Sequence, residues 1–590
     1  MSPKKPLVFK ELAGRKLMLC DVIYQNGNQN TGWSDYLNFV YRDLVTKKKA
    51  IYTIKDPTIT IYEVPEELRS TFKKPRHYME IEKLIPHEVK YRDVLKEIAN
   101  MAGPEYVKYY HENKTRKARQ QLYKWSYCLG GDIPIETYYR VIWEQELDND
   151  ERKYVDCIFL DIEVDQKNWD GPIPRHGECP IDMLSITDPV KKIVSTFYLK
   201  TPDNPQIISF INDRQEELQQ KLHERFDESF PGYEYIQYAF DDEKELLTQT
   251  FRLIHVLKRD ICFIWNMDFD IPYIIGRTQK LGMNVANLFC HSDFPTTTLY
   301  YHEDNNNFDW DTKRNYFDCS SYTKYLDQPA VYAGLRRSQT TLRSVSLNAI
   351  ATKEQVGEGK IKYDSTKGNF IMFSRNDFML YDIYNVNDTL LQAGINEKCN
   401  DSYNLYNSCL HSYCNYKDGM KQTVSLRAFF YKEFLINDGL ILGHNVNFDN
   451  TGHRHTNEFE DDDSISEKDL QESLDSFEGA INGDPELNGY HGIILFGKHS
   501  KYLFGDSIDF DFSAMYPNSI CSFNIFAATM IGKLFIIDGD KLKRYDEDAG
   551  KEFVEDLIAK NSLFLGEKWF GLPSYETLAL EVFERMKDIA

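Results

Sequence analysis

The sequence lacks the features of a membrane protein and of a disulfide-rich secreted protein. No window approaches the ~20 consecutive apolar residues that a membrane span needs, and the N-terminus has no apolar signal core. The 11 cysteines among 590 residues include no Cys-x-x-Cys pair, which argues against a disulfide framework and a zinc ribbon. We therefore expect an intracellular, cytoplasmic protein with reduced thiols that is neither secreted nor attached to a membrane.

Positive charge is also scarce, with 70 Lys and Arg against 92 Asp and Glu and a net charge of −22. Phosphate binding relies on Lys and Arg, so this balance at first argues against a nucleic-acid ligand. The acidic residues are unevenly spread, however, because residues 458–478 hold ten acids and the single base Lys468. We interpret residues 456–478 as a solvated acidic connector.

Residues 114–131 have the opposite character, with five basic residues, no acid and interleaved aromatic residues. Basic side chains hold phosphates and aromatic faces stack bases, so this segment is a candidate nucleic-acid surface. An ordinary solvated helix explains the same pattern equally well. The candidate DNA-binding residues are Arg116, Lys117, Arg119, Lys124 and Trp125.

The length suggests about three to five domains, and the texture of the sequence changes near residue 150. Apolar residues alternate over 36–63 around a lysine turn at 47–49, which predicts antiparallel strands. We assign residues 1–150 to a β-rich N-terminal domain that residues of about 400–475 would complete.

The following region alternates between predicted strands and helices, as an α/β domain does. It covers residues 151–400. Its expected strands lie at 157–164, around Phe197 and at 261–265, and its expected helices lie near 243–257 and 377–391. We assign residues 479–590 to a third, mixed α+β region.

Two carboxylates stand close together in the strand predicted at residues 157–164. Asp161 and Glu163 are two residues apart, so both project from one face while the apolar residues between them pack on the other. Adjacent carboxylates repel unless a cation lies between them, and oxygen ligands of this kind favour Mg²⁺ or Mn²⁺ over zinc. A solvated strand edge is the commoner explanation of such a pair taken alone, so the pair needs partners.

Two further segments supply candidate partners. Asp270 follows the predicted strand at 261–265, at a strand end where α/β sites gather, although it could equally cap the next helix. Tyr384 and Asp388 lie one turn apart on the helix predicted at 377–391, away from its apolar stripe. A phenol one turn from a carboxylate can position a water beside a metal, whereas such a pair taken alone usually lies at the surface.

Together these segments resemble, in order and spacing, the three exonuclease motifs of family B DNA polymerases. The matching residues are Asp161 and Glu163 in Asp-x-Glu, Asn266 to Asp270 in Asn-x-x-Phe-Asp, and Tyr384 to Asp388 in Tyr-x-x-x-Asp. Asp511 to Pro517 is similar to polymerase motif A. Four further stretches resemble the family, in part its T-even-phage-type members: 131–134, 240–243, 272–274 and 477–480.

The resemblance implies a ribonuclease-H-like 3′→5′ exonuclease of the DEDDy type. In such a site Asp161, Glu163, Asp270 and Asp388 hold two divalent ions, Mg²⁺ or Mn²⁺, about 3.5 to 4 Å apart. Tyr384 would orient the attacking water.

One competing register exists for the third motif. Tyr381 also begins a Tyr-x-x-x pattern, but that pattern ends at Asn385, whose neutral side chain is unsuited to replace a metal carboxylate.

Motif A implies a second metal site, in a partial polymerase palm. Asp511 would hold two metal ions, with the Phe512 carbonyl as a further ligand, and the ring of Tyr516 would lie under the incoming deoxynucleotide. The sequence contains neither motif B, Lys-x-x-x-Asn-Ser-x-Tyr-Gly, nor the Asp-Thr-Asp of motif C. With one palm carboxylate, we expect this chain not to polymerise DNA alone.

We interpret the chain as the N-terminal half of a family B DNA polymerase, either from a split gene or truncated. Its implied partners are primer-template DNA, a single-stranded 3′ end, and dNTP in the complete enzyme. Further implied partners are a second polypeptide, which would carry the fingers, the rest of the palm and the thumb, and, separately, a sliding clamp and other replisome proteins. In a virus the location would be the host cytoplasm. Alternatives are a stand-alone 3′→5′ exonuclease with a vestigial palm and a non-catalytic nucleic-acid-binding replisome subunit, which the intact carboxylates disfavour.

Overall fold

The computed structural model divides the chain into two compact units. The first comprises residues 1–71 and 79–445, and the second comprises residues 72–78 and 446–590. The structure describes residues 7–27, 32–69, 78–147, 155–201, 204, 207, 214–304, 313, 315–336, 342, 344–361, 370–419, 421–436, 439–441, 535–538, 562–565 and 568–571.

The described part of the second unit is an antiparallel sheet in which β19 pairs with two other strands. Its strands are β17 (Phe535–Asp538), β18 (Ser562–Leu565) and β19 (Lys568–Gly571). The acidic connector predicted at 456–478 and the motif A segment lie outside the described residues.

The first unit begins with antiparallel strands. β1 (Leu17–Gln25), β2 (Tyr36–Asp43) and β3 (Lys49–Lys55) form one sheet, so the strands and the turn predicted over 36–63 are confirmed. A second sheet pairs β4 (Thr58–Glu63) with β6 (Ile85–Lys90) and β7 (Cys128–Leu129). The other elements of this part are η1 (Lys10–Leu12), α1 (Glu66–Arg69), β5 (Tyr78–Glu80), η3 (Ile81–Lys83), η4 (Tyr91–Asp93), α2 (Val94–Ala102), α3 (Pro104–Glu112), α4 (Arg116–Arg119), η5 (Gln120–Lys124) and α5 (Ile135–Glu146).

A mixed eight-stranded sheet forms the centre of the following region. Its strand order is β11-β10-β9-β8-β12-β15-β14-β13. β9 runs antiparallel to its neighbours β8 and β10, whereas β12 and β15 run parallel to β8. The strands are β8 (Cys157–Val164), β9 (Ile181–Asp188), β10 (Ile193–Leu199), β11 (Glu234–Phe240), β12 (Ile261–Ile264), β13 (Leu299–His302), β14 (Tyr316–Cys319) and β15 (Lys324–Asp327). This arrangement is consistent with an exonuclease domain of the ribonuclease-H-like type.

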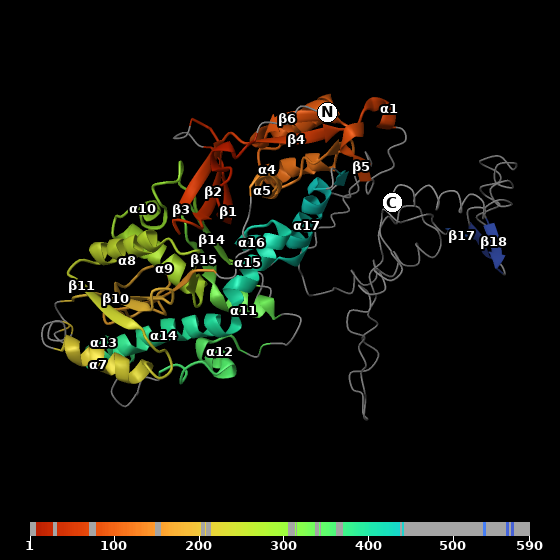
Figure 1. The fold of residues 1–590 in the computed structure, drawn as a ribbon. Helices are drawn as coiled ribbons and strands as arrows, with labels where there is room; N and C mark the ends of the chain where they lie inside the picture. The colour runs from red at the N-terminus through yellow and green to blue at the C-terminus, as the bar shows by residue number, and fades with distance from the viewer. Residues whose placement is uncertain are drawn as a thin grey trace. The chain divides into compact units, whose positions relative to one another are not determined.

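Helices cover both faces of the large sheet (Figure 1). On one face lie α8 (Glu243–Leu257), α9 (Met267–Lys280) and α10 (Val285–Phe289). On the other lie α7 (Gln215–Phe226), α12 (Leu347–Glu354), η7 (Phe370–Met372), α13 (Phe373–Asn376) and α14 (Phe378–Cys399). Because both faces are covered, the central strand β8 needs apolar residues on both sides, as its sequence CIFLDIEV provides.

The helix predicted near 377–391 is confirmed and is longer than expected. Asp377 caps α14 by accepting a hydrogen bond from the Leu380 amide at 3.1 Å, and Asn400 ends it in the left-handed region at φ 54°. Sixteen of its 22 residues are buried, including several polar ones. α14 is therefore a central helix with no solvent-facing side along most of its length.

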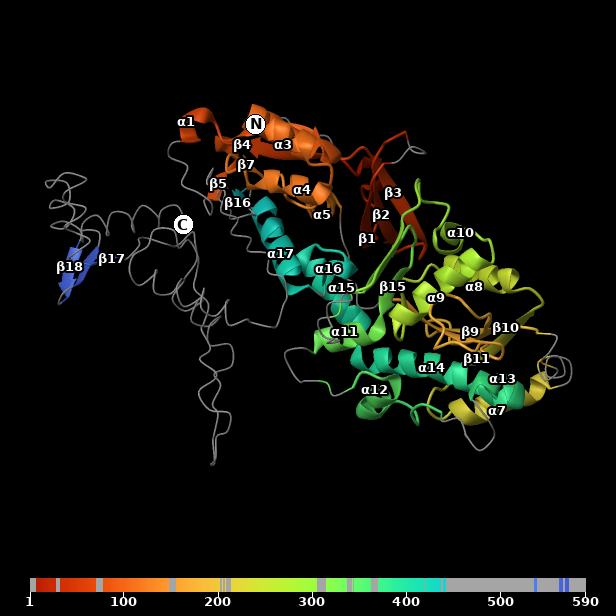
Figure 2. The ribbon, with the colours of Figure 1, turned by 180° about the vertical axis from the view of Figure 1, so that it is seen from behind.

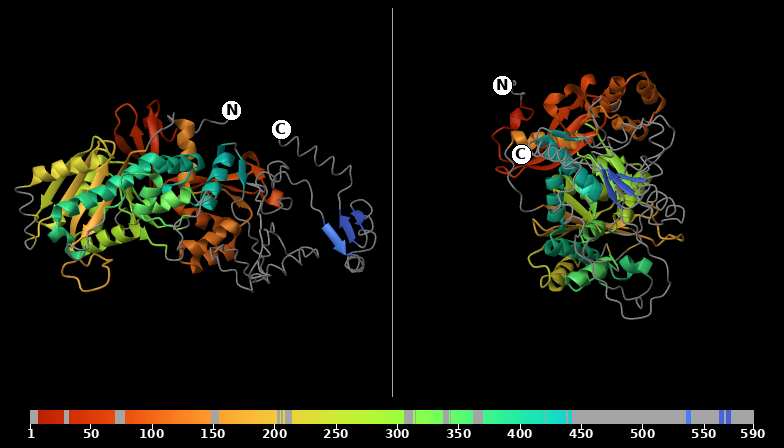
Figure 3. Two further views of the ribbon diagram at one scale, coloured as in Figure 1. Left: turned by 90° about the horizontal axis from the view of Figure 1, so that it is seen from below. Right: turned by 90° about the vertical axis from the view of Figure 1, so that its right-hand side faces the viewer.

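The chain then returns to its N-terminal part through α11 (Gln328–Leu335), α15 (Asp401–Ser412), α16 (Tyr416–Gly419), α17 (Gln422–Ile436) and β16 (Gly439–Ile441). α17 runs beside α5 (Figures 2 and 3). Thr137 donates a hydrogen bond to the Tyr413 carbonyl at 3.0 Å, and the Tyr431 hydroxyl donates to Asp132. These contacts join residues 401–419 and 421–436 to the N-terminal part. Among the described helices, none combines the length and apolarity that crossing a membrane requires.

Buried ion pairs join the N-terminal strands to the starts of two central strands. Asp156 and Asp260 directly precede β8 and β12. Arg42 on β2 contacts both carboxylates, and Lys49 Nζ lies 2.6 Å from Asp260 Oδ1. Arg259 adds a contact to Asp156 at 3.6 Å. Because these side chains are nearly inaccessible to water, each charge depends on its opposite neighbours.

We expect Asp260→Ala to lower the free energy of unfolding by about 3 to 5 kcal/mol, because it removes a partner of two buried cations. Chemical denaturation followed by circular dichroism measures the loss. Arg15→Ala is the control, since the Arg15 side chain is 43% exposed in its pair with Asp43 and should contribute at most about 1 kcal/mol. Equal losses in the two variants would contradict the importance of the buried network.

Candidate active site

The first two carboxylates lie on β8 where it passes the end of β12. Ile264, the last residue of β12, pairs with Leu160, so Asp161 is the first β8 residue beyond β12. Glu163 follows two residues later and shares its face. Asn385 Nδ2 on α14 donates a hydrogen bond to Asp161 Oδ2 at 2.8 Å, so this face of β8 looks toward α14.

Asp270 belongs to the first turn of α9, three to four residues after the helix begins. The helix cap is Asn266, in the left-handed region at φ 75°, and Asp327 Oδ1 accepts a hydrogen bond from the Met267 amide at 3.2 Å. The alternative that Asp270 caps the helix is therefore wrong. Its carboxyl group is buried, on the helix that starts directly after β12.

α14 supplies the third motif. Tyr384 and Asp388 are 8% and 3% exposed, so the alternative of a surface pair is wrong. Asp388 Oδ2 lies 2.6 Å from Lys360 Nζ, whereas Asp388 Oδ1 is buried and makes no hydrogen bond within the described structure. Burial and then the Asp388 charge raise the pKa of the Tyr384 hydroxyl.

The four carboxyl groups act on one another electrostatically. Burial and then the charge of Asp388 raise the pKa of Asp161, and burial and then Asp161 hold the pKa of Glu163 well above its usual range. The pKa of Asp270 is likewise raised, first by burial and then by Asp161. Burial also raises the pKa of Asp388, against the opposing effect of the Lys360 ammonium. Since Asp388 and Asp161 raise the pKa values of their neighbours, a cation bound beside these two groups would be attracted.

Lys360 is the residue of this region that the sequence reasoning missed. Its Nζ contacts Asp388 and lies 4.8 Å from the centroid of the Tyr384 ring, so its positive charge sits between the two residues of the third motif. Asp388 and then the other charges of the site hold the pKa of Lys360 above its usual range despite burial, which keeps it cationic.

A tight turn holds Lys360 in place. Gly359 has a φ of +83°, which favours glycine, and its carbonyl accepts a hydrogen bond from Asn387 Nδ2 at 3.2 Å. Asn348 Oδ1 accepts a hydrogen bond from the Lys360 amide at 2.9 Å. The two nearby glycines in the sequence mark a turn, but no local pattern links that turn to Asp388.

The donor chemistry of these residues fits hard divalent ions. Carboxylate oxygens are the ligands that Mg²⁺ and Mn²⁺ prefer, and the buried Asp388 Oδ1 has an unused acceptor site. Among the described residues, no three Asp, Glu, His or Cys side chains already converge as closely as bound ligands would.

The structure describes only part of the remaining predicted residues. Asp511, Phe512 and Tyr516 lie outside the described residues. Tyr381, the start of the competing register, donates a hydrogen bond from its hydroxyl to Asp182 Oδ1 at 2.9 Å. Asn385 contacts Asp161 through its amide, as a neutral neighbour.

The basic aromatic segment folds into α4 and η5, which carry Lys117 and Lys124. Arg119 Nε donates hydrogen bonds to the carbonyls of Tyr110 and Asn113 at 3.0 and 2.6 Å, so this guanidinium braces the local backbone. The Trp125 ring is 7% exposed and therefore offers little surface on which a base could stack.

Arg116 is exposed, with its guanidinium 5.3 Å from the ring centroid of Tyr91. Lys114, which directly precedes the short helix, is exposed as well. Among the basic residues of this segment whose side chains the structure describes, these two are accessible for contact with phosphates.

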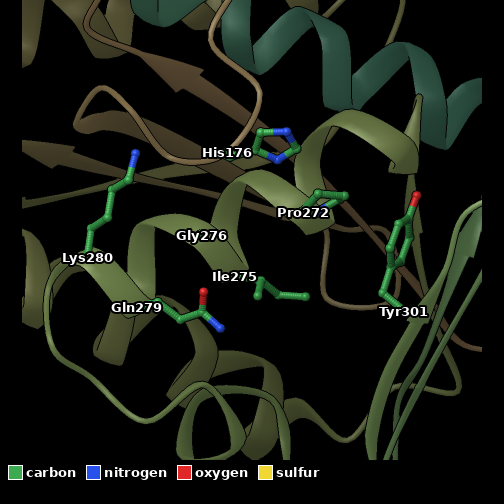
Figure 4. Close-up of a pocket in the computed structure, with 7 residues that line it drawn as sticks. All are labelled: His176, Pro272, Ile275, Gly276, Gln279, Lys280 and Tyr301. Atoms are coloured by element: carbon green, nitrogen blue, oxygen red, sulfur yellow. The ribbon is translucent and has the colours of Figure 1, made fainter.

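A shallow hollow of about 620 Å³ runs along the outer side of α9 (Figure 4). None of the four carboxylates lines it, so it is separate from the candidate site. It forms where the β8–β9 loop crosses α9 closely: a Cβ on Gly177 would lie 2.1 Å from the Arg277 amide nitrogen. Its lining includes Pro272, Ile275, Gly276 and Gln279 of α9, with His176 and Tyr301 facing them.

Comparison with known proteins defines the class of this region. Residues 110–350 match the family model described as DNA polymerase family B, exonuclease domain. This range contains β8 and the start of α9 with Asp161, Glu163 and Asp270, and ends before α14.

Two viral proteins are similar to the chain. A DNA polymerase of Autographa californica nuclear polyhedrosis virus is 23% identical over 253 residues, which cover 40% of this chain and 25% of that protein. A DNA polymerase of Bombyx mori nuclear polyhedrosis virus is 27% identical over 177 residues, which cover 30% of this chain and 17% of that protein. The chain thus matches a quarter or less of these relatives. Residues 110–350 are therefore similar to the exonuclease domain of family B DNA polymerases.

We expect Lys360→Met to lower the free energy of unfolding in the presence of a chelator by about 1 to 3 kcal/mol, because the buried Asp388 carboxylate loses its cation. Added Mg²⁺ should recover more stability in this variant than in the wild type. Thermal unfolding with and without Mg²⁺ measures both effects. Lys353→Met, at an exposed position on α12, is the control and should change stability by less than about 0.5 kcal/mol. Identical Mg²⁺ responses in the two variants would refute the electrostatic role of Lys360.

Proposed function

We propose that the chain removes nucleotides from the 3′ end of single-stranded DNA, as the proofreading 3′→5′ exonuclease of a family B DNA polymerase. The observation that supports this proposal is that the Asp161 and Glu163 face of β8 looks toward α14, which carries Asp388 and hydrogen-bonds to Asp161 through Asn385, while Asp270 lies in the first turn of the helix that follows the neighbouring strand β12. The match of residues 110–350 to the family B exonuclease-domain model supports the same function.

The proposed site is of the DEDDy type within a ribonuclease-H-like domain. Family B exonuclease domains use divalent metals, generally Mg²⁺, and we propose that the four carboxylates hold two such ions. Bound there, the ions would supply an acidic water and a counter-charge for the departing 3′ oxygen.

The remaining polar groups of the site would position the attacking water, the phosphate and the carboxylates. The Tyr384 hydroxyl would orient the attacking water toward the scissile phosphate. Lys360 would hold the Asp388 carboxylate and add positive charge beside the negatively charged phosphate. Asn385 would fix the orientation of the Asp161 carboxylate through its hydrogen bond.

We also propose that Asp511, with the Phe512 carbonyl and the Tyr516 ring, belongs to the palm of the same polymerase. The sequence supports this through its likeness to motif A. DNA synthesis on a primer-template with dNTP would then need motifs B and C, in further polypeptide of this chain or in a separate subunit. A sliding clamp and other replisome proteins would be partners of that complete enzyme.

We expect Asp161→Ala combined with Glu163→Ala to reduce digestion of a single-stranded oligonucleotide by at least about a hundredfold, more than substitutions beside metal ligands usually cause. The reason is that both β8 carboxylates would be missing from the metal site. A gel assay with a 5′-labelled oligonucleotide in Mg²⁺ measures shortening, and chromatography identifies the nucleoside monophosphate product.

The matched control for this variant is Glu224→Ala combined with Glu228→Ala, which removes two exposed acids from the same domain. It should digest the oligonucleotide like the wild type. Full activity of the Asp161 and Glu163 double variant would refute the site assignment. A wild-type chain that digests no DNA would refute the proposed function itself.

We expect Lys114→Gln combined with Arg116→Gln to weaken single-strand binding and to reduce its salt slope by roughly 0.7 for each phosphate interaction that disappears. Fluorescence anisotropy of a labelled oligonucleotide over a range of NaCl concentrations measures the slope. Lys191→Gln with Lys280→Gln, at other positions of the first unit, removes the same charge and serves as control. Equal salt slopes in both double variants would show that residues 114–131 are an ordinary solvated surface.

A further inference from the structure

β9 contains one extra residue directly opposite the catalytic strand. Glu163 on β8 pairs with Met183, but the next residue, Val164, pairs with Ile181, so Asp182 has no partner in the strand register. Such a β-bulge interrupts the alternation of side chains and re-aims the extra residue, and bulges are common beside active sites. The bulge turns Asp182, which is 4% exposed, into the protein interior.

Asp182 meets α14 there. Its Oδ1 accepts a hydrogen bond of 2.9 Å from the Tyr381 hydroxyl, and both side chains are buried. Tyr381 lies one helical turn before Tyr384 and Asn385, the two α14 residues that face Lys360 and Asp161. The bond therefore ties α14 to the strand beside β8 at the level of the candidate site.

A second buried contact lies next to the first. Arg375, on α13 just before α14, pairs with both oxygens of Asp165 at 2.7 and 2.6 Å. Burial and then the charge of Asp165 raise the pKa of Asp182 to about 7. Asp165 directly follows β8 and Asp182 lies on the paired strand β9, and each contacts the α13–α14 helices near the start of α14.

Directional contacts are needed here because apolar packing leaves the rotation of a helix poorly defined. Farther along, Ser185 Oγ donates to the Asn385 carbonyl at 3.1 Å and Thr187 Oγ1 to Thr389 Oγ1 at 2.9 Å. The Tyr381 bond extends this series to the end of β9 that lies beside Glu163.

We propose that Asp182 is a positioning residue of the exonuclease site: its hydrogen bond from Tyr381 fixes the rotation of α14 that brings Tyr384 and Asp388 to the β8 carboxylates. This inference rests on the proposed exonuclease function. Asp182 acts through Tyr381 and contacts neither DNA nor metal. Its role depends on the acceptor oxygen, which asparagine also has.

The test compares four variants in steady-state digestion of a single-stranded oligonucleotide in Mg²⁺, with thermal unfolding of each. Tyr381→Phe and Asp182→Ala should each lower kcat about tenfold, the lower end of effects beside metal ligands, and leave KM within twofold. Asp182→Asn should retain activity within threefold. Asp182→Ala combined with Tyr381→Phe should be no slower than either single variant, because both remove the same bond.

Tyr332→Phe is the matched control, because the Tyr332 hydroxyl also donates to a carboxylate, that of Glu354, away from the site. It should keep the wild-type kcat. If Asp182→Ala does not fold, Tyr381→Phe and Asp182→Asn decide the question.

Three results would overturn the inference: an unchanged kcat in Tyr381→Phe, an Asp182→Asn variant as slow as Asp182→Ala, or additive losses in the double variant. An inactive wild-type chain would instead contradict the proposed function. The two failures are therefore distinguishable.

Discussion

Repulsion among carboxylates with limited access to water is the constraint on which this region of the structure depends. Asp161, Glu163, Asp270 and Asp388 come from three different elements, and burial strengthens their mutual repulsion because little water screens it. A fold selected for stability alone would separate such groups or pair each with a cation. Here Lys360 contacts one of them, and the others are held in place by the packing of β8, α9 and α14.

The burial of α14 shows how that packing is made specific. Apolar side chains on both sides bury the helix. An apolar surface alone, however, allows many rotations and translations of the helix with similar energy. Hydroxyl groups of β9 limit that freedom, since a hydrogen bond is broken when its donor moves by about 1 Å. Ser185 and Thr187 bind the middle of the helix, and the bulge at Asp182 gives the strand a further contact where its regular alternation would have pointed a side chain elsewhere. The β-bulge in β9 thus helps to fix the position of α14 in the proposed site.

The sequence predicted the parts of this architecture that depend on local pattern. The apolar run of β8 with two acids on one face, the helix at 243–257 and the helix beginning near residue 377 were all visible in it, because strand and helix periods are local properties. The burial of Tyr384 and Asp388 could not be predicted from the sequence, because it depends on which segments from far away in the chain pack against α14. Lys360, Asp182 and the brace made by Arg119 were missed for the same reason: each acts through a tertiary contact or a bulge. The palm residues Asp511, Phe512 and Tyr516 are still supported by motif alone.

The two ends of the central strands differ in how far the charges of their carboxylates are compensated. At the starts of β8 and β12, Asp156 and Asp260 are buried but surrounded by Arg42, Lys49 and Arg259, so their charges are compensated within the protein. Toward the other ends, the carboxylates of β8 and α9 are only partly compensated. Parallel strands bring their carboxyl ends to one edge, where loops and helix starts can vary without disturbing the pairing behind them. The same residue type therefore stabilises one end of the sheet, where its cations are built in. At the other end Lys360 contacts Asp388, and the charges of Asp161 and Glu163 are less fully compensated within the described residues.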